Sequence, residues 1–67
     1  MRILLNNRIE VFDADQLTVS KLLSLKNYTF PMVVIRVNNK LVRKDEYDNT
    51  VINDGDDVSV IHLISGG

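Results

Sequence analysis

The chain opens with two short runs in which apolar and polar residues alternate, separated by the Asn6-Asn7 pair. Alternation with a period of two is typical of a strand that buries one face. Asparagine tolerates the positive φ that a two-residue hairpin turn requires, so the first twelve residues are expected to form a β-hairpin. The alternation assigns four residues to the core face, namely Ile3, Leu5, Ile9 and Val11.

The spacing of apolar residues changes after the hairpin. Val19, Leu22 and Leu23 follow one another as i, i+3 and i+4, which places them along one stripe of a helix. Thr18 is suited to cap the start of this helix, and Asn27 is suited to the left-handed residue that ends it. A helix of about two to three turns is marginal alone, so we expect it to pack on the sheet.

The second half of the chain contains its most apolar stretch, followed by a second turn pair, Asn38-Asn39. Residues 43–57 are mostly polar and acidic and predict a loop. The strands expected in this half span 33–37, 41–42 and 58–63. Their alternation assigns to the core Val33, Ile35, Val37, Val58 and Val60. Strands combined with one crossing helix predict an α+β fold.

A single helix covers only one face of a sheet, so the opposite face is expected to be exposed. The apolar residues predicted on that face are Leu4, Val34, Ile61 and Leu63. A contiguous exposed apolar patch is typical of a protein-binding surface. We therefore expect these four residues, with Arg36 at their rim, to bind partner proteins.

Composition narrows the classes of function. The 67 residues contain no cysteine and one histidine, which excludes disulfides, cysteine catalysis and zinc sites of the usual kind within the chain. The net charge is −1 and the basic residues are scattered, which argues against nucleic acid as a partner. No apolar run approaches the roughly 20 residues of a membrane span, and none resembles a signal peptide. The expected location is the cytoplasm.

The side chains offer little catalytic chemistry. His62 has no cysteine or second histidine as a partner, and strand alternation separates it from Ser59 and Ser65, so a structural role is favoured. The acidic residues of 45–57 lack the ligand spacing of a calcium-binding loop. Gly66 and Gly67 open no helix and so do not form a phosphate-binding loop.

The Gly66-Gly67 end is the most unusual feature of the sequence. Glycine has no Cβ, so a Ser65-Gly66-Gly67 tail would be a thin, pliable thread that enters a narrow active site. A carboxylate is a poor electrophile, but its adenylate is a mixed anhydride that a sulfur or nitrogen nucleophile attacks. The alternative is a frayed terminus without a function.

Several segments in this order resemble the ThiS family of thiamine-pathway sulfur carriers, which are ubiquitin-like β-grasp proteins. They are the opening hairpin, "TVSKLL", "VVIRVNNKLV", the "DGD" turn and the final "SGG". The resemblance spans essentially the whole chain, although Asn38-Asn39 stands where the family often has Asn-Gly. It implies a β-grasp domain at 1–64, with a mixed four- to five-stranded sheet and one helix, and a flexible tail at 65–67.

The resemblance also implies a carrier without enzymatic activity of its own. A ThiF-like adenylating enzyme would use ATP to activate the Gly67 carboxylate, and sulfur from a cysteine persulfide would convert it to a thiocarboxylate. Thiazole synthase would then receive the sulfur. The chain itself would bind no cofactor and would be a monomer when free.

Three other functions remain open at this point. The chain could be a sulfur carrier of another pathway, such as the molybdopterin type, or a ubiquitin-like modifier joined to lysines of target proteins. It could also be a plain interaction module that uses only its sheet, in which case a tail ending in alanine would serve equally well.

Overall fold

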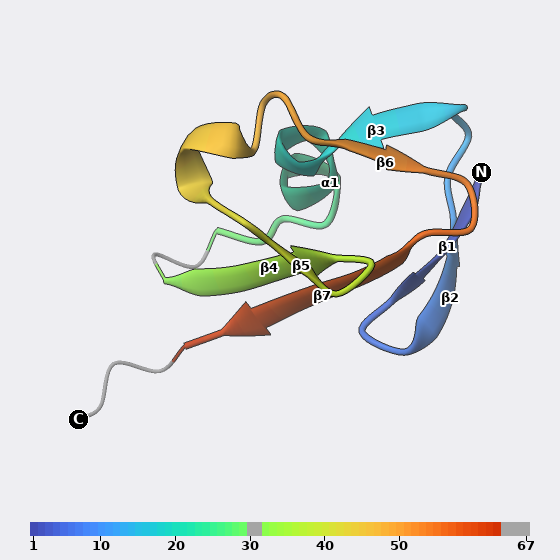
Figure 1. Ribbon diagram of the computed structural model, residues 1–67. Coiled ribbons are helices and arrows are strands. Elements are labelled where there is room, and N and C mark those ends of the chain that lie inside the picture. The colour runs from blue at the N-terminus through green and yellow to red at the C-terminus, as the bar shows by residue number, and fades with distance from the viewer. Residues whose placement is uncertain (30–31, 64–67) are drawn as a thin grey trace.

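The computed structural model describes residues 1–29 and 32–63. Along this part of the chain lie β1 (Arg2–Leu5), β2 (Arg8–Val11), β3 (Gln16–Thr18), α1 (Val19–Leu25), β4 (Val33–Val37), β5 (Lys40–Val42), the 3-10 helix η1 (Lys44–Glu46), β6 (Val51–Asn53) and β7 (Asp57–His62). Among these elements, five strands form one sheet in the order β2-β1-β7-β4-β5, and β3 pairs with β6 separately. The α1 helix and the β3–β6 pair lie on the same side of the larger sheet (Figure 1).

The larger sheet is mixed because β1 and β7 are parallel, whereas its other neighbouring strands are antiparallel. This arrangement confirms the expected α+β class with one helix packed on one face of a mixed sheet. The division at residue 64 between a domain and a tail lies outside the described residues. No helix among residues 1–29 and 32–63 is long and apolar enough to cross a membrane.

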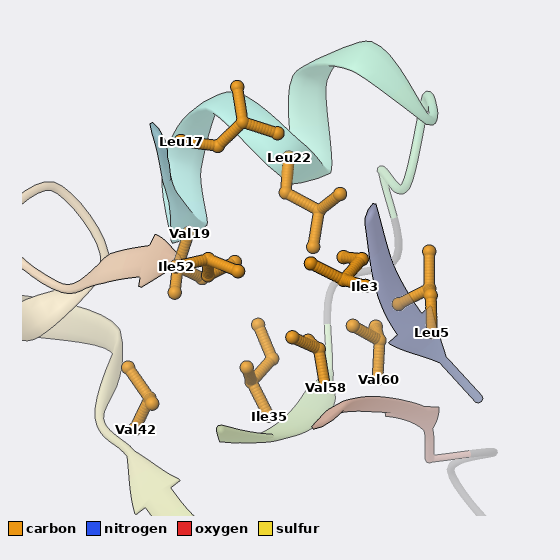
Figure 2. Packing of buried hydrophobic residues seen from close by; sticks show 10 residues of the cluster. All are labelled: Ile3, Leu5, Leu17, Val19, Leu22, Ile35, Val42, Ile52, Val58 and Val60. Carbon is orange, nitrogen blue, oxygen red and sulfur yellow. The ribbon is translucent and has the colours of Figure 1, made fainter. Parts of the chain in front are cut away.

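The core lies between α1, the β3–β6 pair and the inner face of the larger sheet. Leu22 and Val19 of the helix are fully buried, as are Ile35 of β4 and Val58 of β7. Figure 2 shows these side chains pointing toward one another from the helix and the sheet. The inward orientation expected for strands 33–37 and 58–63, which correspond to β4 and β7, is therefore confirmed.

The local signals at turns and caps are also confirmed. The Thr18 hydroxyl accepts the Lys21 backbone N–H at 3.1 Å and so caps α1. Asn27 has a φ of 56°, and the next residue, Tyr28, closes the helix with a bond from its N–H to the Leu23 carbonyl. Both residues of the Asn6-Asn7 turn have positive φ, as do both residues of the Asn38-Asn39 turn.

The predicted orientation of β2 is wrong. Ile9 and Val11 are 63% and 69% exposed, because the two-residue turn pairs Leu5 with Arg8 and Leu4 with Ile9. Residues directly opposite one another in an antiparallel pair share a face, so Ile9 lies on the outer face with Leu4. The inner positions of β2 belong to Arg8 and Glu10, and Glu10 forms a 2.8 Å ion pair with Lys26 at the end of α1.

The polar stretch before the last strand is more ordered than the sequence suggested. It contains η1 and β6, and β6 pairs with β3 in an antiparallel register that places Leu17 opposite Ile52. Ile52 is fully buried and Leu17 is 7% exposed. The loop expectation failed because a three-residue strand shows almost no periodicity of its own.

Candidate functional site

The candidate site is the end of β7 and the surfaces beside it. Ser65, Gly66 and Gly67, the expected tail and attachment residues, lie outside the described residues. Their starting point is described: β7 ends at His62, and the Leu63 backbone N–H donates to the Met32 carbonyl at 3.0 Å. The chain is therefore anchored to its neighbour up to four residues before the end of the sequence.

Strand β7 occupies the centre of the larger sheet, with β1 on one side and β4 on the other. On the β4 side its pairing is continuous, from Val37 opposite Val58 to Val33 opposite His62. On the β1 side only two pairs form, because β1 turns away at Asn6 after Leu5 has met Val58. The end of β7 therefore depends on further contacts on that side.

Asparagine side chains from both hairpin turns supply contacts to β7. Asn6 accepts the Val60 N–H on its Oδ1 at 2.8 Å and donates from its Nδ2 to the Val60 carbonyl at 3.2 Å. Asn38 accepts the Asp57 N–H on its Oδ1 at 2.9 Å and donates from its Nδ2 to the Asp56 carboxylate at 3.0 Å. This role was not predicted from the sequence, which indicated only turns at both residues. The sequence feature that could have indicated these bonds is the repeated Asn-Asn pair. The side chain of one asparagine in each pair can form hydrogen bonds outside the turn.

Three of the expected partner-binding residues lie together on the outer face, opposite the helix. Val34 of β4 stands directly across from Ile61 of β7, and Arg36 stands across from Ser59. Ile61 is 47% exposed, Val34 is half-buried and Arg36 is exposed. We call Val34, Arg36 and Ile61 the outer patch.

Leu4 is exposed on the same face but is not part of the outer patch. It is in register with Asp57 of β7, four residues before Ile61, which corresponds to about 13 Å along a strand. Its cross-strand neighbour is Ile9 of β2. The expected patch is therefore divided, because β1 pairs with the beginning of β7 and not with its end.

Leu63 lies beside a different surface. It lines a pocket of about 530 Å³ together with Val33 and Val42, which occupy inner positions of β4 and β5. The remaining lining residues come from α1, from the segment that follows it, from β5 and from the region of η1; they are Leu23, Tyr28, Met32, Leu41, Arg43, Lys44 and Tyr47. We call this the helix-side pocket.

The described side chains do not form a metal centre: within residues 1–29 and 32–63, no group of three histidine, cysteine, aspartate or glutamate residues could hold an ion. His62 is exposed at the last position of β7 and pairs in register with Val33. What this part of the chain offers is a firmly held strand end with an apolar surface on each side of the sheet.

Comparison with known proteins shows what this arrangement resembles. The family model described as "ThiS family" matches residues 2–67. A crystal structure of the thiamine biosynthesis protein ThiS from Geobacter metallireducens is similar with a TM-score of 0.87 and 30% identity, covering 100% of both chains. A solution structure of a thiamine biosynthesis protein from the same organism has a TM-score of 0.78 at 30% identity, covering 100% of this chain and 88% of the other. No curated protein sequence matches this chain.

Proposed function

The chain belongs to the ThiS family, whose members are small sulfur carriers with a ubiquitin-like β-grasp fold, and from that premise we propose that Gly67 carries sulfur as a thiocarboxylate for thiazole formation in thiamine biosynthesis. The observation that carries the proposal is that the family match includes the Gly66-Gly67 end. Four residues, 64–67, follow the anchored Leu63 and could span up to about 14 Å if fully extended. That reach suits delivery of a carboxylate into the active site of another protein.

The proposed chemistry takes place on partner enzymes. In the active site of a ThiF-like adenylating enzyme, a carboxylate oxygen of Gly67 attacks the α-phosphorus of ATP, and pyrophosphate leaves. A cysteine persulfide then attacks the acyl carbon, and AMP leaves with the electron pair of the broken C–O bond. A thiol cleaves the resulting acyl disulfide, so that the thiol is oxidised to a disulfide and the thiocarboxylate remains. Thiazole synthase then accepts the sulfur.

The outer patch is the proposed docking surface for these enzymes. The half-buried Val34 and the exposed Ile61, with Arg36 at their rim, suit a modest interface that forms and separates as the carrier moves between partners. Leu4 and Leu63 are proposed to contact partners from separate positions, at the other end of the sheet and at the helix-side pocket.

The decisive experiment is a mass measurement. The chain is incubated with its adenylating enzyme, ATP and a persulfide donor, and its intact mass is determined. The expected product has one terminal oxygen replaced by sulfur, and a chain lacking Gly67 is the control that should remain unchanged while its thermal unfolding shows an intact fold. An unchanged mass of the full chain would refute the proposal, and adducts to lysines of other proteins would instead support the modifier function.

A further inference from the structure

A second apolar surface flanks the exit of β7, on the side of the sheet opposite the outer patch. The helix-side pocket is formed where the end of α1, the strands β4 and β5 and the region of η1 meet. Figure 1 shows α1, η1 and the beginning of β4 near the end of the sheet at which β7 ends. Because Leu63 itself lines this pocket, any protein that binds the following residues must pass beside it.

The lining of the pocket is apolar and cationic. Met32 and Leu63 are large apolar side chains that remain 49% and 42% exposed. Among the described residues that line it, Arg43 and Lys44 are the charged ones, and none is an aspartate or glutamate. Lys44 takes part in no ion pair within the described part of the chain, while Arg43 forms a 3.6 Å contact with Asp45 in which both side chains are largely exposed and screened.

The chemistry of the tail makes such a surface necessary. Glycines present no side chains, so an adenylating enzyme cannot distinguish this carrier from other chains by Gly66 and Gly67 alone. Recognition has to come from side chains of the domain, and those beside the end of β7 are close to any enzyme that binds the tail. The outer patch supplies such residues on one face, and the helix-side pocket supplies them on the other.

We propose that the helix-side pocket receives an apolar side chain of the adenylating enzyme, flanked by a carboxylate that pairs with Lys44 and Arg43. This inference rests on the proposed function and adds the chemistry of the partner. The cationic rim selects an acidic segment, and the exposed Met32 and Leu63 require an apolar group to cover them. The enzyme thereby contacts both faces of the sheet beside the exit of β7.

The test compares paired variants in the adenylation reaction of the full chain. Lys44→Glu reverses a charge at the pocket, and Lys40→Glu makes the same reversal on exposed β5 outside its lining. Met32→Ser removes an apolar wall, and Leu25→Ser removes an equally exposed side chain, 49% in both cases, from α1 outside the pocket. Binding to the adenylating enzyme, the KM for the carrier and kcat for pyrophosphate release are measured for each.

We expect Lys44→Glu and Met32→Ser each to raise the KM for the carrier and the Kd by about tenfold or more, with kcat nearly unchanged. The loss of affinity caused by Lys44→Glu should diminish as the salt concentration is raised from about 0.1 M to about 1 M, because ions screen the charges. Lys40→Glu and Leu25→Ser should behave as the wild type. Circular dichroism verifies that each variant is folded.

Each outcome decides a different point. If the wild-type chain is not adenylated, the proposed function fails and this inference fails with it. If the wild type is adenylated and the two pocket variants match their controls, the function stands and the pocket proposal is overturned. A wild-type chain that self-associates, and loses that association on Lys44→Glu, would show that a second copy fills the pocket and would likewise overturn the proposal.

Discussion

Asn6 binds both backbone polar groups of Val60, accepting its N–H at 2.8 Å and donating to its carbonyl at 3.2 Å. The backbone N–H of Asn6 also donates to the Val58 carbonyl at 2.9 Å. The side-chain amide thus continues the pairing of β1 with β7 past the point where the main chain turns away. Strand β7 is therefore held on both sides, by β4 on one side and by β1 and the Asn6 side chain on the other.

Replacement of Asn6 by aspartate should destabilise the domain. Aspartate tolerates the φ of 51° and retains the acceptor for the Val60 N–H, but it has no donor for the Val60 carbonyl and places a negative oxygen beside it. We expect a loss of about 1 to 2 kcal/mol in the free energy of unfolding, measured with urea. Asn7→Asp, in the same turn, should change it by less than about 0.5 kcal/mol. Equal losses at both positions would contradict the role given to Asn6.

Glycine substitutions in the second turn should have opposite signs at adjacent positions. Asn39 has a φ of 70° and makes no side-chain hydrogen bond within the described residues, so Asn39→Gly should stabilise the domain by up to about 1 kcal/mol. Asn38→Gly removes the bonds to Asp56 and Asp57 and should destabilise it by about 1 kcal/mol. Thermal unfolding measures both, and a shift in the same direction for the two variants would refute this assignment.

The orientation of β2 can be tested with two isoleucines. Ile35 is fully buried, so Ile35→Ala should cost about 2 to 5 kcal/mol through lost burial and the cavity left behind. Ile9 is 63% exposed, so Ile9→Ala should cost less than about 0.5 kcal/mol. Denaturant unfolding of both variants gives the comparison. A large loss of stability for Ile9→Ala would indicate that Ile9 is buried in the core and would contradict the observed register of the hairpin.

The Lys26–Glu10 contact should make stability depend on pH in the alkaline range. The hydrogen bond from Lys26 Nζ to Glu10 raises the pKa of Lys26 above its ordinary value of 10.5, against the desolvation that lowers it; the charges of Glu10 and Tyr28 raise it further. The folded state therefore holds this proton more tightly than the unfolded state does. The stabilisation is fully present below the unfolded pKa and is lost as the pH rises through the folded pKa.

Two lysine variants measure this contribution. The difference in urea stability between the wild type and Lys26→Met should be constant at neutral pH and should shrink above pH 10.5. Lys21→Met is the control, because Lys21 is exposed on the same helix and forms no ion pair among the described residues. A Lys26→Met difference that persists undiminished at high pH would show that the ammonium charge is not its source.

The outer patch predicts a loss of binding without a loss of folding. Ile61→Asp places a charge on a side chain that is 47% exposed and should weaken binding to the adenylating enzyme by about tenfold or more, measured by calorimetry. Val11→Asp is the control, because Val11 is 69% exposed on the same face but belongs to the edge strand β2. Equal affinities for the two variants would show that the outer patch is not part of the interface.

The features that sequence reasoning predicted correctly are local ones. Thr18 caps α1, the two Asn pairs form turns with positive φ, and Ile35 and Val58 face the core. Each depends on the intrinsic preference of one residue or on a period within a few neighbours. The resemblance to the ThiS family also came from short motifs in a fixed order, and the family match confirmed it.

What only the tertiary structure decided is how segments distant in the sequence meet. The parallel register of β1 with β7 separates Leu4 from Ile61, and the hairpin register turns Ile9 to the surface. The pairing of β3 with β6, the bonds from Asn6 to Val60 and the walls of the helix-side pocket also join distant parts of the chain. The periodicity of the sequence indicates which residues share one face of a strand. It does not state which strand lies beside which, since that choice is made by packing of the whole core.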